Sequence, residues 1–136
     1  MTGDRPGCVL VAPSIDDLAV LAERALADIP AAFRVHLGTI EIRVEEFPNA
    51  ETEAEMGLES PFDLMGLYRG VSLDQKSISD PAPEADQVFL YRRPLLDYWC
   101  ETGEDLEHLI RHVLIHEIGH HFGFSDEDME RIEVEG

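Results

Sequence analysis

The sequence has few cysteines and few basic residues, and each shortage excludes a class of protein. Its two cysteines, Cys8 and Cys100, are too few for a disulfide framework and lack the paired spacing of a cysteine zinc site. The chain carries 10 basic and 29 acidic side chains, for a formal charge of −19. Because nucleic-acid phosphates are bound by clustered Lys and Arg, we expect no nucleic-acid partner.

Long apolar runs are also absent from the sequence. None approaches the ~20 residues that span a membrane, and the apolar run at residues 8–11 is far shorter than the core of a signal peptide. We therefore expect a cytoplasmic protein with reduced cysteines and no membrane partner. An apolar content of 44% in 136 residues is typical of one globular domain with a single core.

The first half of the chain contains two regular patterns. Apolar residues recur at helical spacing over residues 14–29, with Ser14 and Asp17 suited to an N-terminal cap and Pro30 to the end of the helix. Apolar and charged residues alternate strictly over residues 39–47, which predicts a half-buried strand. A short second helix or turn is expected in between, near Phe33.

The second half begins with an acidic stretch, residues 48–63, interrupted by Pro and Gly, which predicts a solvated loop with room for one helical turn. Residues 64–71 and 87–92 predict two more strands, with residues 72–86 as the connection between them. A short helix is expected to open at Pro94, since proline suits the first helical turn.

The last predicted helix runs from about residue 104 to residue 122. Thr102 and Asp105 form an N-cap signature, and Gly123 suits the C-terminal end. Its first turns have an apolar stripe, and continuing the same period leads to His116, Glu117 and His120. The stripe consists of Leu106, Leu109, Ile110 and Val113.

The chemistry lies in HEIGHHFGFSD, residues 116–126. Residues four apart share one helix face, so His116 and His120 can bind one zinc ion at about 2.0–2.1 Å. Glu117 flanks that face as a candidate general base. Gly123 permits a chain reversal, after which Asp126 can return as the third ligand. The longer match, with Gly and Asp in place, is far more specific than the five-residue core.

Several alternatives to this zinc site remain at this point. The simplest is a pair of buried histidines without a metal. The pairs His108/His112 and His112/His116 have the same spacing but no following Glu; with His121, we interpret His108 and His112 as surface residues. Glu127 and Asp128 are alternative third ligands. Only the position of Asp126 within the motif distinguishes it from them.

Other reactive side chains have no pattern that selects them. Cys100 has no partner at metal spacing, and we interpret it as a half-buried thiol. Tyr68, Tyr91 and Tyr98 are all chemically able to stabilise an oxyanion, and the sequence does not distinguish among them.

At these residues the chain resembles the zincin metallopeptidases, and HExxHxxGxxD resembles the metzincin form with aspartate as third ligand. GLYRGVSL (66–73), VFLYRRPLLDYWC (88–100) and LIHEIGHHFGFSDEDME (114–130) are similar to a small bacterial family of possible zinc metallopeptidases with a minimal zincin fold. The resemblance begins at about residue 14. It implies one zincin-like domain, residues 14–136, preceded by an extension, residues 1–13.

This resemblance also implies a fold and a site. The fold is α+β, with a small mixed β-sheet packed against the active-site helix. The zinc ligands are His116, His120 and Asp126, and the catalytic glutamate is Glu117. One departure is the methionine turn of metzincins, which lies well after the zinc motif, whereas Met129 stands only three residues after Asp126.

The leading functional hypothesis is hydrolysis of peptide bonds in a peptide or protein substrate by a zinc-bound water that Glu117 activates. An extended peptide is expected to pair with a sheet edge, with residues 64–70 as the candidate. The alternative is a zinc-stabilised binding or scaffold module with little or no turnover. A zinc-dependent ribonuclease is disfavoured by Glu117 and by the acidic charge. The sequence does not predict the oligomeric state.

Overall fold

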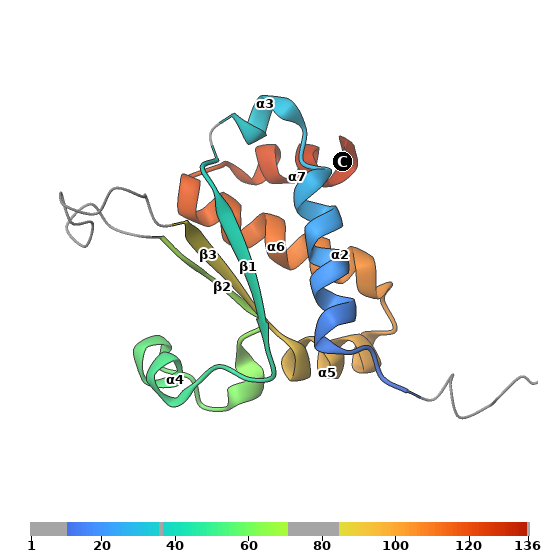
Figure 1. Cartoon of the computed structure of the whole chain (residues 1–136), viewed down its shortest axis with the longest axis vertical. Helices are drawn as coiled ribbons and strands as arrows, with labels where there is room; N and C mark the ends of the chain where they lie inside the picture. The colour runs from blue at the N-terminus through green and yellow to red at the C-terminus, as the bar shows by residue number, and fades with distance from the viewer. Residues whose placement is uncertain (1–10, 36, 71–84, 136) are drawn as a thin grey trace, which may run out of the picture.

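The computed structural model describes residues 11–35, 37–70 and 85–135, and its centre is a three-stranded mixed sheet (Figure 1). The strands β1 (Ile40–Glu45), β2 (Gly66–Arg69) and β3 (Asp86–Tyr91) lie in the order β1-β3-β2. β3 pairs parallel with β1 and antiparallel with β2. The predicted fold class, α+β with a small mixed sheet against the motif helix, is confirmed.

The alternation in β1 explains which face of the sheet is buried. Ile42 lies opposite Val88 and Val44 opposite Leu90 in the parallel ladder, so the apolar residues of both strands share one face. Val88 and Leu90 are fully buried there. The charged residues of β1 point to the other face, as the strict alternation predicts.

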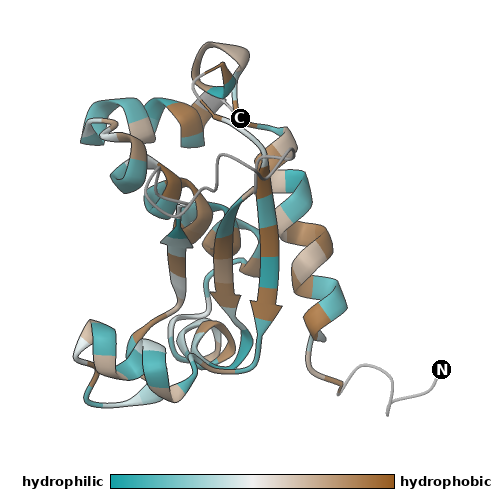
Figure 2. Ribbon diagram, turned by 60° about the vertical axis from the view of Figure 1, so that its left-hand side comes forward, coloured by the Kyte–Doolittle hydropathy of each residue, from teal (hydrophilic) through white to brown (hydrophobic). Residues whose placement is uncertain are grey.

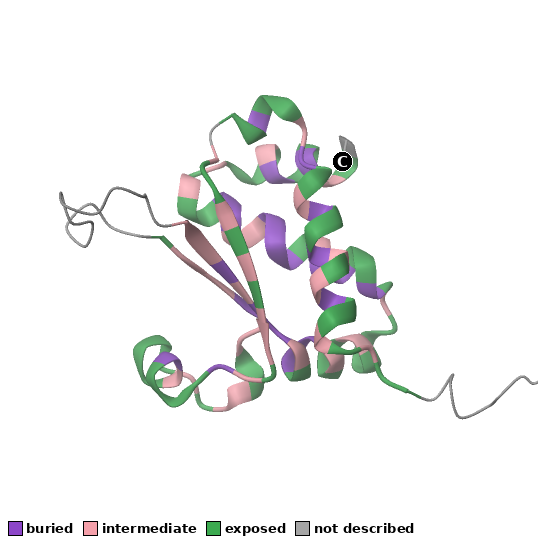
Figure 3. Ribbon diagram, viewed as in Figure 1, coloured by how far each residue is buried: buried purple, intermediate pink, exposed green. Residues whose placement is uncertain are grey.

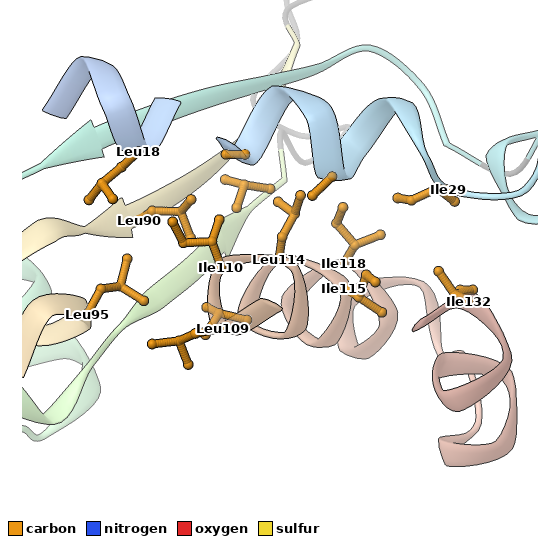
Figure 4. Close-up of a cluster of buried hydrophobic side chains, with 14 of the residues drawn as sticks. Leu18, Ile29, Leu90, Leu95, Leu109, Ile110, Leu114, Ile115, Ile118 and Ile132 are labelled. Carbon is orange, nitrogen blue, oxygen red and sulfur yellow. The ribbon is translucent and has the colours of Figure 1, made fainter. Parts of the chain in front are cut away.

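Helices α2 (Ile15–Ala27) and α6 (Leu106–Phe122) pack against each other, and both contact the sheet (Figures 1 and 3). The N-terminus of α2 has the predicted capping box, with Asp17 N–H donating to Ser14 Oγ at 3.0 Å and Ser14 N–H to the Asp17 carboxylate at 2.8 Å. Hydrophobic and hydrophilic stretches alternate along the ribbon of α2 (Figure 2), because its buried residues recur about once per turn. The side chains between the two helices and the sheet form one apolar core (Figure 4).

Helix α6 is the central element of this core because it is packed on several sides. It contacts α2, strands β2 and β3, α5 (Arg92–Thr102) and α7 (Asp126–Glu135). A helix surrounded in this way is apolar on more than one face. Its buried residues are Leu106, Leu109, Ile110, Val113, Leu114, Ile115, Ile118 and Gly119.

The predicted start of the last helix is wrong. Helix α5 continues through Thr102, whose hydroxyl donates to the Tyr98 carbonyl at 2.9 Å, and ends at Gly103 in a left-handed conformation (φ 70°). Asp105 then takes the N-cap position of α6 without a side-chain hydrogen bond. The Thr102 signature therefore belongs to the end of one helix rather than to the start of the next.

Two further segments differ from expectation. The predicted loop at residues 48–63 contains α4 (Ala50–Met56), capped by Asn49, and a short 3-10 helix, η1 (Pro61–Asp63). The segment after the motif forms α7, which the sequence patterns did not predict. The short helix or turn expected near Phe33 is confirmed, as α3 (Ala31–Arg34).

Part of the predictions lies outside the described residues. This applies to residues 1–10 of the predicted extension and to most of the connection at residues 72–86. The division into an extension and one domain stays a prediction. Among the described helices, none is both long and apolar enough to cross a membrane.

Candidate metal centre

Four histidines stand four residues apart along α6: His108, His112, His116 and His120. His116 and Glu117 are partly exposed and His120 is exposed, so the expectation that they continue the buried stripe is wrong. Ile115, Ile118 and Gly119 are buried in these turns instead, because this end of the helix is also packed against α7. The two motif histidines therefore lie beside the core, where an ion and water can reach them.

His116 and His120 are neighbours on this face. Their ring centroids are 5.9 Å apart and the rings are nearly perpendicular, at 82°. With Zn–N bonds of about 2.0–2.1 Å, this separation is short enough for one ion to bind both rings. Two imidazoles and a carboxylate also form a donor set that suits zinc. These residues therefore fit the metal that the motif predicts.

Glu117 is held next to this pair by strand β2. Its carboxylate accepts a hydrogen bond from the backbone of Tyr68 and lies close enough to His120 for an electrostatic interaction. Burial raises the pKa of Glu117 above the ordinary glutamate value, and the Tyr68 hydrogen bond and His120 oppose that rise. A carboxylate with a raised pKa beside a histidine pair is the arrangement that a general base requires.

Asp126 is the first residue of α7 and is exposed. The metal-binding group that the described residues form does not include it or His120, and Asp126 stays a prediction as third ligand. Asp128 makes a capping box with Ser125, in which Asp128 N–H donates to Ser125 Oγ at 3.0 Å and Ser125 N–H to the Asp128 carboxylate at 3.3 Å. This engagement favours Asp126 over Asp128.

Glu133, on α7, is the functional candidate that sequence reasoning missed. One carboxylate oxygen lies 2.7 Å from His112 Nδ1 and the other lies 3.4 Å from His116 Nε2. The ligand atoms of these three residues lie within 4.8 Å of one another. The signal that could have revealed α7 is the Ser125/Asp128 box followed by Met129 and Ile132, three residues apart.

The remaining candidates are separated by their surroundings. His121 is exposed, and its ring stacks on Tyr68 with centroids 4.0 Å apart. The Tyr68 hydroxyl donates to Asp86 at 2.7 Å, and burial first and Asp86 second raise the pKa of Tyr68. Tyr91 is buried and hydrogen-bonded to Thr52, whereas Tyr98 is exposed on α5.

Of the three tyrosines, Tyr68 is therefore the one that contacts the motif end of α6. The interpretation of Cys100 as half-buried is wrong, because its side chain is exposed near the end of α5.

Comparison with known proteins agrees with this geometry. The sequence model of the zincin-like metallopeptidases matches residues 37–136, from just before β1 to the end of the chain. The chain therefore belongs to the family of zincin-like metallopeptidases, and membership implies a bound metal, typically zinc. No curated protein matches the chain.

Proposed function

We propose that this chain is a zinc-dependent peptidase in which His116, His120 and Asp126 bind the metal and Glu117 is the general base. The observation that carries the proposal is the position of Glu117, partly buried beside His120 and hydrogen-bonded to the backbone of β2. A glutamate that served only as a surface charge has no need of such a position. The family's metallopeptidase character supports the same assignment.

The proposed chemistry divides between the metal and Glu117. When bound, zinc with three protein ligands supplies an open position for water, lowers the pKa of that water toward about 7 and polarises the scissile carbonyl. Glu117 accepts the proton of the attacking water and returns it to the leaving amine. The Tyr68 backbone hydrogen bond keeps the carboxylate oriented during both transfers.

The substrate is proposed to be an extended peptide. Strand β2 pairs with β3 on one side and forms an edge of the described sheet. An edge strand offers backbone groups to a peptide that adds as a further strand. Because Tyr68 of β2 contacts Glu117, a peptide paired along β2 passes next to the proposed base. This supports residues 64–70 as the substrate-binding segment.

Replacing Glu117 by Gln tests the catalytic assignment. The substitution keeps the side chain's size and its hydrogen bond from Tyr68 but removes the base, so kcat is expected to fall by about 10²–10⁴. The measurement is digestion of an unbiased peptide library by zinc-loaded protein, read by mass spectrometry, with zinc content measured in parallel. Glu107→Gln removes one exposed charge from the same helix and is the matched control.

The outcome also decides the alternative, a zinc-stabilised binding module. One observation favours that alternative: the three ligand atoms that the structure gathers, on His112, His116 and Glu133, include neither His120 nor Asp126, two of the proposed peptidase ligands. If zinc raises the melting temperature of the wild type while neither wild type nor Glu117→Gln cleaves any peptide, the peptidase proposal is wrong and the binding module replaces it.

A further inference from the structure

We propose that His112, His116 and Glu133 form a second metal position that shares His116 with the peptidase site, so that the chain binds one ion at either position but not at both. The sharing rests on the proposed function, in which His116 is a zinc ligand. The second position itself rests on the geometry of α6 and α7 alone.

The distances between the three side chains are close to those around a bound ion. Ligand atoms of a tetrahedral zinc ion, with bonds of about 2.0–2.2 Å, lie about 3.4 Å apart. One carboxylate oxygen of Glu133 is 2.7 Å from His112 Nδ1, a hydrogen-bond distance, and the other is 3.4 Å from His116 Nε2. All three ligand atoms lie within 4.8 Å of one another, so small side-chain movements place them around one ion.

Burial gives the cluster a reason to bind a cation. The side chain of Glu133 is 17% exposed, compared with 31% for His116 and 49% for His112. A carboxylate shielded to this degree is costly unless a cation or a hydrogen-bond donor compensates it. In the metal-free chain the contact with His112 Nδ1 at 2.7 Å provides that compensation. A divalent ion bound by both imidazoles can replace it and remains open to solvent on the side of His112.

The packing of α7 makes the cluster rigid. Met129 and Ile132, which precede Glu133 on α7 by four residues and by one, are each 1% exposed. The Arg111 guanidinium on α6 also donates to the Ile132 carbonyl at 2.7 Å, next to Glu133 in the chain. A ligand set supported by buried neighbours of this kind loses little conformational freedom when it binds an ion.

The donor chemistry indicates which ions fit. Two imidazole nitrogens and one carboxylate oxygen suit Zn²⁺, Ni²⁺ or Cu²⁺, whereas Ca²⁺ and Mg²⁺ prefer sets composed of oxygen. Glu117 belongs to the other pair, beside His120 and β2. An ion between α6 and α7 is thus bound without that base, and the second position corresponds to a metal-loaded state that does not hydrolyse peptides.

Zinc binding to the full-length His120→Ala variant tests the second position. We expect this variant to retain one Zn²⁺ per chain in calorimetric titration and to lose peptide hydrolysis. Adding His112→Ala or Glu133→Gln is expected to weaken zinc binding by at least about 10- to 100-fold, the loss typical even of an outer-shell partner. Adding His108→Ala instead is the matched control, because His108 is exposed one step further along the ladder.

The opposite results are equally clear. The inference is overturned if His120→Ala binds no zinc while the wild type does, or if its zinc is insensitive to both His112→Ala and Glu133→Gln. Two zinc ions per wild-type chain would overturn the sharing of His116. Circular dichroism of each metal-free variant identifies any protein that does not fold. If the His112→Ala variant does not fold, the near-isosteric Glu133→Gln variant carries the test. Failure of the peptidase proposal, by contrast, is detected by the peptide digestion with wild type and Glu117→Gln. It does not change the result expected in these zinc titrations.

Discussion

The two histidine pairs of α6 that share His116 have the same spacing but different neighbours. His112 and His116 face Glu133 of α7, with ring centroids 4.0 Å apart. His116 and His120 stand beside Glu117, whose carboxylate is bound by the backbone of β2. Four-residue spacing is therefore common to both metal positions that we propose. The second element that each pair meets, a helix or a strand, determines what the metal can do.

The two carboxylates show the same contrast. Glu133 bridges both rings of its pair and is positioned as a ligand. Glu117 is positioned by a backbone hydrogen bond and by burial, which together leave its carboxylate available as a base. A base and a ligand thus differ by which neighbouring element holds the carboxylate, although both are glutamates within reach of the same histidine ladder.

Replacing His116 by Ala gives the largest expected effect, because His116 is common to both pairs. Zinc affinity is expected to fall by more than about 100-fold, and hydrolysis is expected to disappear with the metal. His112→Ala and His120→Ala each leave one pair intact and should lose less affinity. Competition with a chromophoric zinc chelator measures all three variants under the same conditions.

This ranking separates the shared ligand from two independent sites. If His116→Ala and His120→Ala lose zinc to the same extent, His112 and Glu133 contribute nothing. His108→Ala is again the control, since it shortens the ladder without touching either pair.

Replacing Met129 by Ala is expected to cost about 2–5 kcal/mol of unfolding free energy. Its side chain is 1% exposed and packs where α7 crosses α6, so close to Gly119 that a β-carbon there would clash with the methionine sulfur. Urea denaturation measures the loss. In the His120→Ala background, zinc affinity should also fall, because Met129 fixes the helix that carries Glu133.

Val134→Ala is the control for Met129→Ala, because Val134 is on the same helix and 79% exposed. Its effect is expected to stay within about 0.5 kcal/mol. Equal losses for the two variants would show that α7 is not anchored to α6 through Met129.

Sequence patterns correctly predicted the elements whose stabilising features lie within one short segment of the chain. The alternation over residues 39–47 predicted β1, and the Ser14 box predicted α2, since both signals are complete within one segment. The prediction that Thr102 caps the last helix was wrong, because a threonine hydroxyl can bond within the last turn of one helix as well as at the start of the next. Helix α7 was missed because its apolar signal is short, limited to Met129 and Ile132, and these side chains are buried only through packing against the rest of the fold.

The candidate site divides in the same way. The motif predicted that His116, Glu117 and His120 share one region of a helix, and the structure brings His116 and His120 together with Glu117 beside them. Glu133 was not predictable, because its distance to His112 depends on how α7 crosses α6. The expectation that His116, Glu117 and His120 continue the buried stripe was also wrong. Helix α6 is covered on several sides, so a single stripe does not describe its buried residues.

The smallest expected effect is on the pH dependence of stability in the metal-free protein, and it distinguishes Glu117 from an ordinary surface glutamate. Burial raises the pKa of Glu117 in the folded state, so its protonated form stabilises the fold, and that contribution is lost as the pH rises through the raised pKa. Glu117→Gln, which carries no charge, should therefore be more stable than the wild type at about pH 7.5, with a difference that shrinks toward about pH 5.

Urea denaturation of metal-free wild type, Glu117→Gln and the exposed control Glu107→Gln measures this difference. The Glu107→Gln control shows how much of the difference comes from removing one acidic charge from the same helix. A Glu117→Gln variant that is less stable at the higher pH, or whose difference from wild type does not change with pH, would contradict the inferred desolvation of this carboxylate.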